Sequence, residues 1–297
     1  MKPTTSRWLR FGLGALIWAG LTAALVTGWE SAQQQLVSSA PLVAVAVPMI
    51  VVGLVGGAKG WATLQPLEIH RRALRAFLAA QPAKYLPGGA AFQFLGQIGM
   101  TSATRSDRSR VGVSFVVHAL VQMVSASSVA AFLLVAPPEN SGWLPMVVMA
   151  LAIALPLALR TSVIQAGVGL VQRMLRSIDL TGSPPATRAL WGSWAWTLLP
   201  LLFSGTAFAV LAGQATSFLA IVATVGAFSA AWLAGFVAFP LPSGLGVREI
   251  VLVQLLPAMS PAQVIATSVL HRFSTLLAEL LVLIVVSRRA FAAPDPP

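Results

Sequence analysis

The chain has no cysteine among its 297 residues, and charged side chains are scarce. The absence of cysteine excludes disulfides, thiolate catalysis and thiolate metal sites, and leaves the redox compartment open. Only 9% of the residues are charged, whereas 57% are hydrophobic, and the mean hydropathy is +0.83. A soluble domain of this length cannot bury so much apolar surface, so the sequence predicts a protein whose solvent is lipid.

The apolar stretches indicate an all-α polytopic membrane protein. In lipid every backbone polar group needs an internal partner, which leaves transmembrane helices or a closed barrel. The stretches are about twenty residues long and do not alternate as the strands of a barrel do, so we expect helices. Full spans are predicted at 9–28, 41–59, 111–135, 143–162, 189–212 and 262–287, and helical hairpins at 70–100 and 216–257.

Two points of this assignment stay open. The first apolar stretch could be a signal peptide, but its length and the lack of a clear cleavage site favour a retained span. The limb 216–238 of the second hairpin is long enough to cross the membrane, so the limbs could be re-entrant or fully spanning.

Basic residues predict the orientation of the chain. All of the 19 Lys and Arg residues except Arg248 and Arg272 fall in the segments 1–10, 59–84, 101–110, 160–188 and the tail from 288. The predicted spans place these segments on one side of the membrane, which the positive-inside rule makes the cytoplasmic side. We therefore expect a protein of the cell inner (cytoplasmic) membrane with both termini in the cytoplasm. The same distribution argues against nucleic acid as the partner of a chain with net charge +11.

Two Pro/Gly interruptions occupy corresponding places in the two halves of the sequence. Leu86-Pro87-Gly88-Gly89 breaks the first hairpin, and Leu241-Pro242-Ser243-Gly244 breaks the second. A histidine follows each in a later apolar helix, at His118 and His271. The order span, span, hairpin, span describes residues 1–136 and again 141–289, and 290–297 is expected to be a short disordered tail.

This order predicts an inverted repeat. Each half has three full crossings, so the second half must start from the opposite side of the membrane. Helix breaks that meet near the midplane of such a repeat are typical of alternating-access carriers. The alternative is that the two Leu-Pro-x-Gly segments match by coincidence.

Charged residues within apolar helices are the first candidates for function, because a charge in the bilayer costs several kcal/mol unless it is paired or hydrated. Arg248 follows Gly244 and Gly246, where a helix that restarts after a break presents N–H groups and a positive dipole end to a phosphate. The guanidinium adds a fork of donors for the same group.

A charge network is predicted beside Arg248, from Glu249, His271, Arg272 and Glu279. Arg272 and Glu279 are two helical turns apart, so we expect Arg272 within reach of Glu249 or Glu279. The alternative is that these charges only pair to hold helices together.

The first half offers polar rather than charged candidates. Tyr85 is the one tyrosine of the chain, and Gln93 and Gln97 share a helix face after Gly89. The glutamines could line a polar cavity or could hydrogen-bond between helices. The three histidines are widely spaced and no carboxylates cluster, so neither a metal site nor a catalytic site is predicted, and no cofactor.

Three motifs resemble the signature of the flippase-like integral membrane family, which includes the transmembrane flippase domain of lysylphosphatidylglycerol synthases. They are Lys84-Tyr85-Leu86-Pro87-Gly88-Gly89, Pro242-Ser243-Gly244-Leu245-Gly246-Val247-Arg248-Glu249, and His271-Arg272 with Glu279. The resemblance covers nearly the whole chain, and the string Pro-x-Gly-x-Gly-Val-Arg-Glu is its most specific part. Ala90-Ala91-Phe92 departs from the family pattern, which makes the first motif the weaker match.

The resemblance implies movement of a lipid with a polar, often phosphate-bearing, head group between leaflets. Lipid aminoacylation is not expected, because the sequence contains no soluble aminoacyl-transferase domain. The alternative function is a non-transporting membrane accessory subunit, whose partner would be a lipid-modifying or glycosyl-transferring enzyme. The residues expected to bind the head group are Tyr85, Pro87, Gly88, Gly89, Gln93, Gln97, Pro242, Ser243, Gly244, Gly246 and Arg248.

Overall fold

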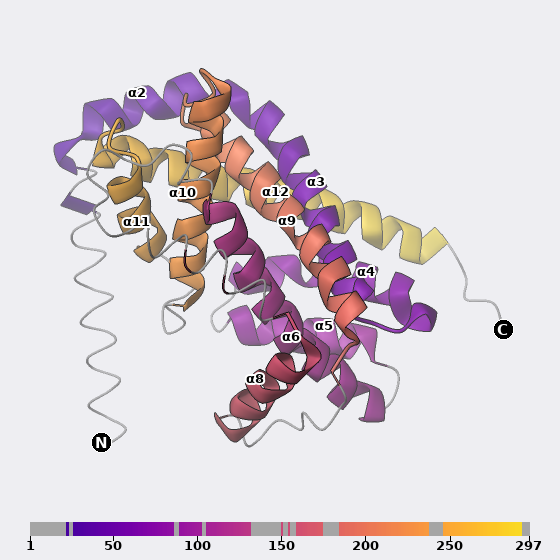
Figure 1. The fold of residues 1–297 in the computed structure, drawn as a ribbon. Helices are drawn as coiled ribbons and strands as arrows, with labels where there is room; N and C mark the ends of the chain where they lie inside the picture. Colours follow the sequence, from indigo (N-terminus) through magenta and orange to yellow (C-terminus); the bar gives the residue numbers. More distant parts are fainter. Residues whose placement is uncertain are drawn as a thin grey trace, which may run out of the picture.

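The computed structural model describes residues 22–23, 26–85, 89–102, 105–131, 150, 154, 159–174, 184–237 and 246–292. These residues form helices and connecting turns, without a strand (Figure 1). Segments long and apolar enough to cross a membrane are Trp29–Thr63, Arg108–Ala130, Thr187–Leu211, Phe218–Val237 and Pro261–Arg288. The expectation of a multi-pass, all-helical membrane protein is thus confirmed.

The predicted spans agree with these segments wherever the structure describes them. The spans 41–59, 111–135, 189–212 and 262–287 each coincide largely with one of the segments. The spans 9–28 and 143–162 fall mostly outside the described residues, and so do Leu86–Gly88 and Leu241–Gly244 of the two breaks. The remaining segment, Phe218–Val237, is the first limb of the second predicted hairpin, and its length favours a limb that crosses fully.

In the first half, α2 (Trp29–Ser39) continues through a 3-10 turn at Ala40–Leu42 into α3 (Val43–Thr63). It then forms α4 (His70–Ala80), a 3-10 helix at Gln81–Tyr85, α5 (Gly89–Thr101) and α6 (Arg105–Ala130). The second half contains α8 (Thr161–Met174), α9 (Thr187–Leu211), α10 (Phe218–Val237), α11 (Val247–Leu255) and α12 (Pro261–Ala292).

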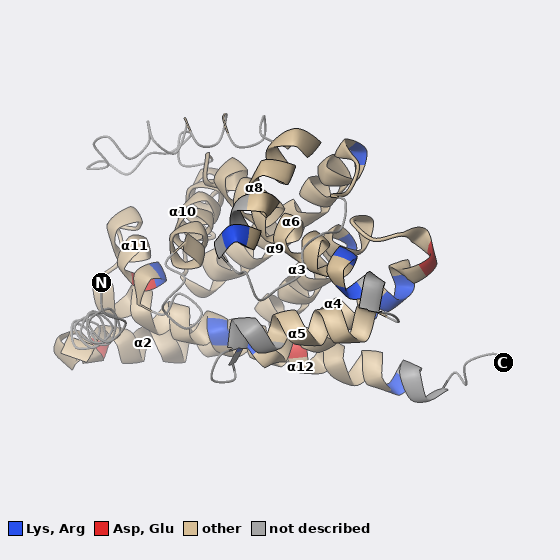
Figure 2. Ribbon diagram, turned by 90° about the horizontal axis from the view of Figure 1, so that it is seen from below, with Lys and Arg blue, Asp and Glu red and all other residues tan. Residues whose placement is uncertain are grey.

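Both predicted hairpins are pairs of packed helices, α4 with α5 and α10 with α11. They differ in polarity. α10 is apolar along its length, whereas α4 buries Ala73 and Phe77 and exposes the arginines of its other face, visible as blue segments in Figure 2. The first limb of the first hairpin therefore has one basic, exposed face and one buried face.

The centre of the fold is a close antiparallel contact between α3 and α9, which lie side by side in Figure 1. A Cβ atom added to Gly53 would lie 3.1 Å from the Cα of Pro200, and one added to Gly192 would lie 3.0 Å from Cγ2 of Thr63. Residue numbers rise along α3 as they fall along α9, so the two helices run in opposite directions. Small residues allow this close approach. In lipid the hydrophobic effect does not drive helices together, so they associate through such close packing.

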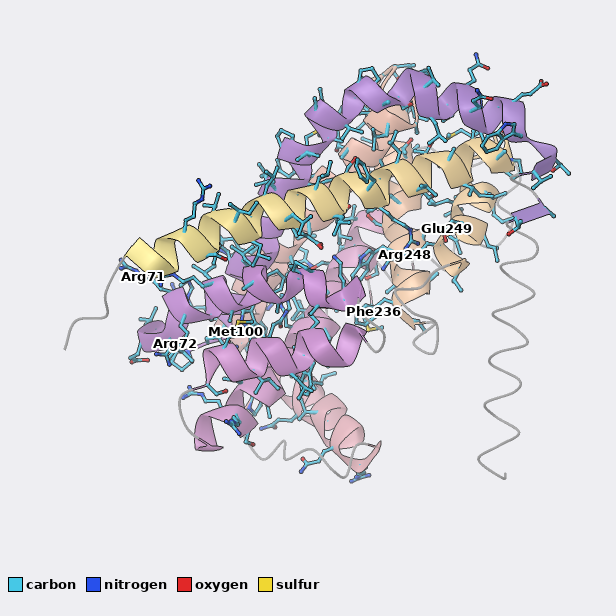
Figure 3. The ribbon with its side chains drawn as sticks, turned by 180° about the vertical axis from the view of Figure 1, so that it is seen from behind. Arg71, Arg72, Met100, Phe236, Arg248 and Glu249 are labelled. Atoms are coloured by element: carbon cyan, nitrogen blue, oxygen red, sulfur yellow. The ribbon has the colours of Figure 1, made fainter. Side chains whose placement is uncertain are left out.

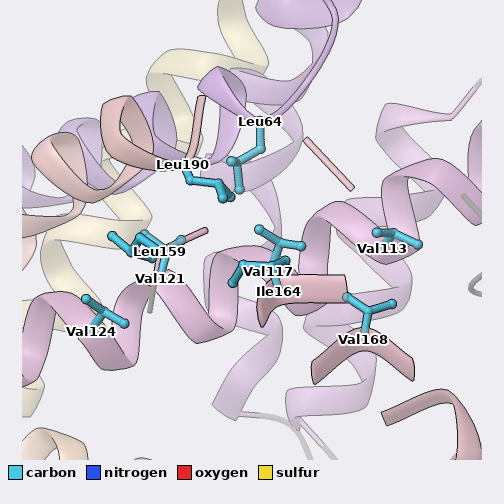
Figure 4. Packing of buried hydrophobic residues seen from close by; sticks show 9 residues of the cluster. All are labelled: Leu64, Val113, Val117, Val121, Val124, Leu159, Ile164, Val168 and Leu190. Carbon is cyan, nitrogen blue, oxygen red and sulfur yellow. The ribbon is translucent and has the colours of Figure 1, made fainter. Parts of the chain in front are cut away.

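Apolar clusters surround this pair. Ala58 and Trp61 of α3 pack with Phe77 of α4, and Phe208 of α9 packs with Leu252 of α11. A third cluster joins α6 to α8 and to the end of α3 (Figure 4); it consists of Leu64, Val113, Val117, Val121, Val124, Leu159, Ile164, Val168 and Leu190. Each predicted hairpin is thereby packed against the central pair.

The close approach predicts that Gly56→Ala destabilises the protein. The new Cβ would lie 2.6 Å from Cβ of Leu199 and 3.1 Å from the backbone oxygen of Trp196, so α9 must move. Overpacking of this kind costs about 1–3 kcal/mol, which thermal unfolding in detergent measures. The matched control is Gly99→Ala in α5, where a Cβ meets nothing within 4 Å. Equal melting temperatures for the two variants would contradict the packing argument.

Candidate functional site

The candidate site is organised by α12, the longest helix that the structure describes. It packs against α2, α3, α4, α9 and α11, and it carries His271, Arg272 and Glu279. Arg272 and Glu279 are seven residues apart and so share a face of the helix. Each of the two is paired with a residue from a different predicted hairpin.

Arg272 pairs with Glu249 of the second hairpin. Its Nη2 donates to Oε1 of Glu249 across 2.7 Å, and the Glu249 side chain is buried. The expectation that Arg272 lies within reach of Glu249 or Glu279 is therefore confirmed. A buried carboxylate is stable here because an arginine and a backbone donor share its charge.

The backbone donor is Gly246, whose N–H lies 2.7 Å from Oε2 of Glu249. Gly246 has a φ of +88°, a conformation that residues with a Cβ rarely adopt. Because Glu249 is the third residue of α11, its carboxylate binds the N–H of the residue just before the helix and fixes where α11 begins. Both oxygens of Glu249 are thus engaged, one by Gly246 and one by Arg272.

Glu279 pairs with Lys84 of the first hairpin, whose Nζ donates to Oε1 of the carboxylate. The Glu279 side chain is 0% exposed and that of Lys84 is 28% exposed. The sequence places Lys84 in the basic segment 59–84. The structure pairs it with Glu279, nine residues before Arg288 and so about 14 Å from it along the axis of α12. One feature of the sequence could have indicated that Lys84 belongs to the site: it lies two positions before Leu86, where the first break begins.

Arg248 lies on α11 beside Glu249, next to α12 (Figure 3). Its guanidinium carbon is 5.8 Å from the centroid of the Trp232 ring. The aliphatic part of the side chain fills the space beside Gly235, where an added Cβ would lie 2.6 Å from Cγ of Arg248. Arg248 is therefore packed against α10 rather than extended into water, as expected for an arginine in this position.

His271 is the remaining member of the predicted charge network. It is buried between Phe208 and Phe228, with ring centroids 5.8 and 5.0 Å away in edge-to-face contacts. Arg272 follows His271 on α12, Arg248 lies on α11 and Lys84 pairs with Glu279, so three elements bring cations to α12. Among the described residues the group has two carboxylates and three cations, a composition that suits an anionic ligand.

The chain matches no protein-family model and no curated protein. The family resemblance described above therefore rests on the sequence motifs alone.

The other predicted head-group residues are only partly described. Pro87, Gly88, Pro242, Ser243 and Gly244 lie outside the described residues. Tyr85 ends the 3-10 helix and Gly89 begins α5. Gln93 is half-buried, and Gln97 is 1% exposed with a carbonyl oxygen that has no hydrogen-bond partner in the described part of the chain. Both alternatives for these glutamines, cavity lining and helix contact, stay open.

The buried pair predicts that Arg272→Ala destabilises the protein, because it leaves the Glu249 carboxylate buried without its cation. Breaking such a pair costs about 3–5 kcal/mol, measured by chemical or thermal unfolding in detergent. Arg288→Ala is the matched control, since Arg288 is exposed near the end of the same helix. A melting temperature for Arg272→Ala equal to that of the control would mean that the pair does not stabilise the fold.

Proposed function

We propose that this protein is a carrier that moves a lipid with a phosphate-bearing head group between the leaflets of the membrane. The observation that carries the proposal is that Lys84 and Arg272 pair with carboxylates on or beside one face of α12, with Arg248 next to Glu249, inside a bundle of apolar helices. Lysine and arginine both bind phosphate, and arginine does so with two parallel hydrogen bonds. The lipid tails can remain in the bilayer, so only the head group needs a polar path.

The depth of the cations supports this proposal. Arg272 lies 11 residues after Pro261 and 16 residues before Arg288, so it is about 16 Å and about 24 Å from the two ends of the apolar part of α12. Among the described residues, Lys84, Arg248 and Arg272 outnumber Glu249 and Glu279 in this region. Charges placed this deep among apolar helices are candidates for function.

The packing of the helices supports the inverted repeat that the sequence predicts. Exchanging the two halves replaces α3, α4, α5 and α6 with α9, α10, α11 and α12. The contacts of α6 with α9 and α10 then become those of α12 with α3 and α4, and both sets occur. The contacts of α4 with α3 and α5 become those of α10 with α9 and α11, which also occur.

His118 and His271 also occupy corresponding positions when the two halves are exchanged. His118 of α6 lies edge-to-face with Trp61 of α3 and Phe77 of α4, at centroid distances of 5.8 and 5.7 Å. His271 of α12 makes the same kind of contact with α9 and α10. Since α3 and α9 correspond and run antiparallel, the two-fold axis relating them is perpendicular to both. This supports inversion of the second half, the arrangement that carriers use for alternating access.

The proposed orientation can be tested because the native chain has no cysteine. Glu30 and Glu68 are both exposed, near α2 and α4 respectively. In intact cells we expect a membrane-impermeant maleimide to label Glu30→Cys from outside and to label Glu68→Cys only after the membrane is permeabilised. The opposite labelling pattern would reverse the proposed topology.

The function itself predicts that Arg248→Ala strongly slows lipid movement without unfolding the protein. Losing a hydrogen-bonded charge from the phosphate should slow flipping by roughly tenfold to a hundredfold. Vesicles containing the purified protein and fluorescent lipids with different head groups give the rate, and detergent melting gives the stability.

Arg71→Ala is the control for this measurement, since Arg71 is exposed on α4. Flipping by folded Arg248→Ala at the wild-type rate would refute the assignment of Arg248. If the wild-type protein moved none of the lipids, the carrier proposal would fail, and purification with a lipid-modifying enzyme would then favour the accessory-subunit alternative.

A further inference from the structure

The ion pair between Lys84 and Glu279 joins the two predicted repeats. Lys84 lies at the end of the first limb of the first hairpin, two residues before the first break. Glu279 lies on the last span of the second repeat. The pair therefore links a mobile part of a proposed carrier, the hairpin, to the helix that carries the charge network.

This pair is less completely satisfied than the pair between Arg272 and Glu249. The Glu249 carboxylate binds Arg272 with one oxygen and the N–H of Gly246 with the other. In contrast, Oε2 of the fully buried Glu279 has no hydrogen-bond partner among the described residues. Desolvation of that oxygen is not offset by a donor from the described residues, so Glu279 is costlier to bury than Glu249.

Lys84 also lies near the arginines. Glu279, which holds Lys84, is two helical turns from Arg272 on the same face of α12, about 10 Å along the axis. A phosphate bound by Arg248 and Arg272 would therefore be near enough to attract Lys84 as well. Carboxylate and phosphate oxygens are both acceptors for an ammonium group, and a phosphate offers more of them.

We infer that Glu279 competes with the lipid phosphate for Lys84, so that binding of the head group exchanges the Lys84–Glu279 pair for a Lys84–phosphate pair and uncouples the two repeats. This inference rests on the proposed function. It adds to it that binding of the substrate releases Lys84 from Glu279. Without a phosphate, separating the repeats would remove the lysine from the buried Glu279 carboxylate, which is costly. With a phosphate, the lysine keeps an anionic partner, so the substrate lowers the barrier to the conformational change.

The first test compares binding of two probes to variants in detergent. The probes are a short-chain phosphatidylglycerol and the matching diacylglycerol that lacks the phosphate, and the shift in melting temperature reports binding. Glu279→Gln removes the competitor, so we expect it to bind phosphatidylglycerol about tenfold more tightly than wild type, with no gain for diacylglycerol. Glu68→Gln is the matched control, because Glu68 is exposed.

The second test separates binding from folding. Lys84→Gln alone leaves the Glu279 carboxylate buried without its cation and could fail to fold. The double variant Lys84→Gln/Glu279→Gln leaves neither charge unpaired and should fold. We expect it to melt near the wild-type temperature and to bind phosphatidylglycerol about tenfold more weakly than wild type. Lys59→Gln is the matched control, since Lys59 is exposed and contacts the Trp196 ring at 4.3 Å.

The outcomes distinguish this inference from the proposed function. It is overturned if Glu279→Gln binds phosphatidylglycerol no more tightly than wild type, or if the double neutral variant binds it equally well. The carrier proposal survives either result, provided that wild type flips lipid and Arg248→Ala does not. If wild type neither prefers phosphatidylglycerol to diacylglycerol nor flips lipid, both are overturned.

Discussion

The charges of α12 set the strongest constraint on this fold, because they lie inside an apolar bundle where unpaired ions are costly. Glu279 pairs with Lys84, which brings the end of the first limb of the first hairpin to the helix. Arg272 pairs with Glu249, which brings the start of the second limb of the second hairpin to the same face. The positions of both hairpins therefore depend on two ion pairs that are two helical turns apart, and a change in either pair would move a hairpin.

The centre of the molecule is held by a different interaction, which gives the hairpins something rigid to move against. α3 and α9 touch through glycines, so their approach depends on backbone shape rather than on charge. A contact of this kind has one arrangement, since shifting it would drive Cα and Cβ atoms together. Ion pairs, in contrast, can exchange partners at small cost when a new anion is present. In the proposed carrier, the glycine contact is the fixed part and the ion pairs are the exchangeable part.

The sequence predicted the helical class, most described spans and the Arg272–Glu249 pair, because length, hydropathy and helical spacing determine them directly. It did not predict that Lys84 pairs with the buried Glu279, because counting basic residues along the chain does not show which of them find a partner. It also missed α2, whose polar residues hide its continuation into α3. One further signal was available: Pro48 and Gly53 of α3 have the spacing of Pro200 and Gly205 of α9. How close the two breaks lie stays a prediction, since both fall largely outside the described residues.

The two halves repeat their packing but not their chemistry. His118 and His271 lie in similar aromatic surroundings, yet Gln122 hydrogen-bonds to His118 across 3.1 Å, whereas His271 lies next to Arg272 on the helix to which the cations come. If both halves carried these cations, two groups of charges would have to be desolvated among apolar helices. With one group on α11 and α12, which Lys84 joins from the other half, the desolvation cost arises only once. In the proposed carrier, the first repeat would supply a shape that matches the second and one lysine that responds to the ligand, which would be sufficient for two states around one binding site.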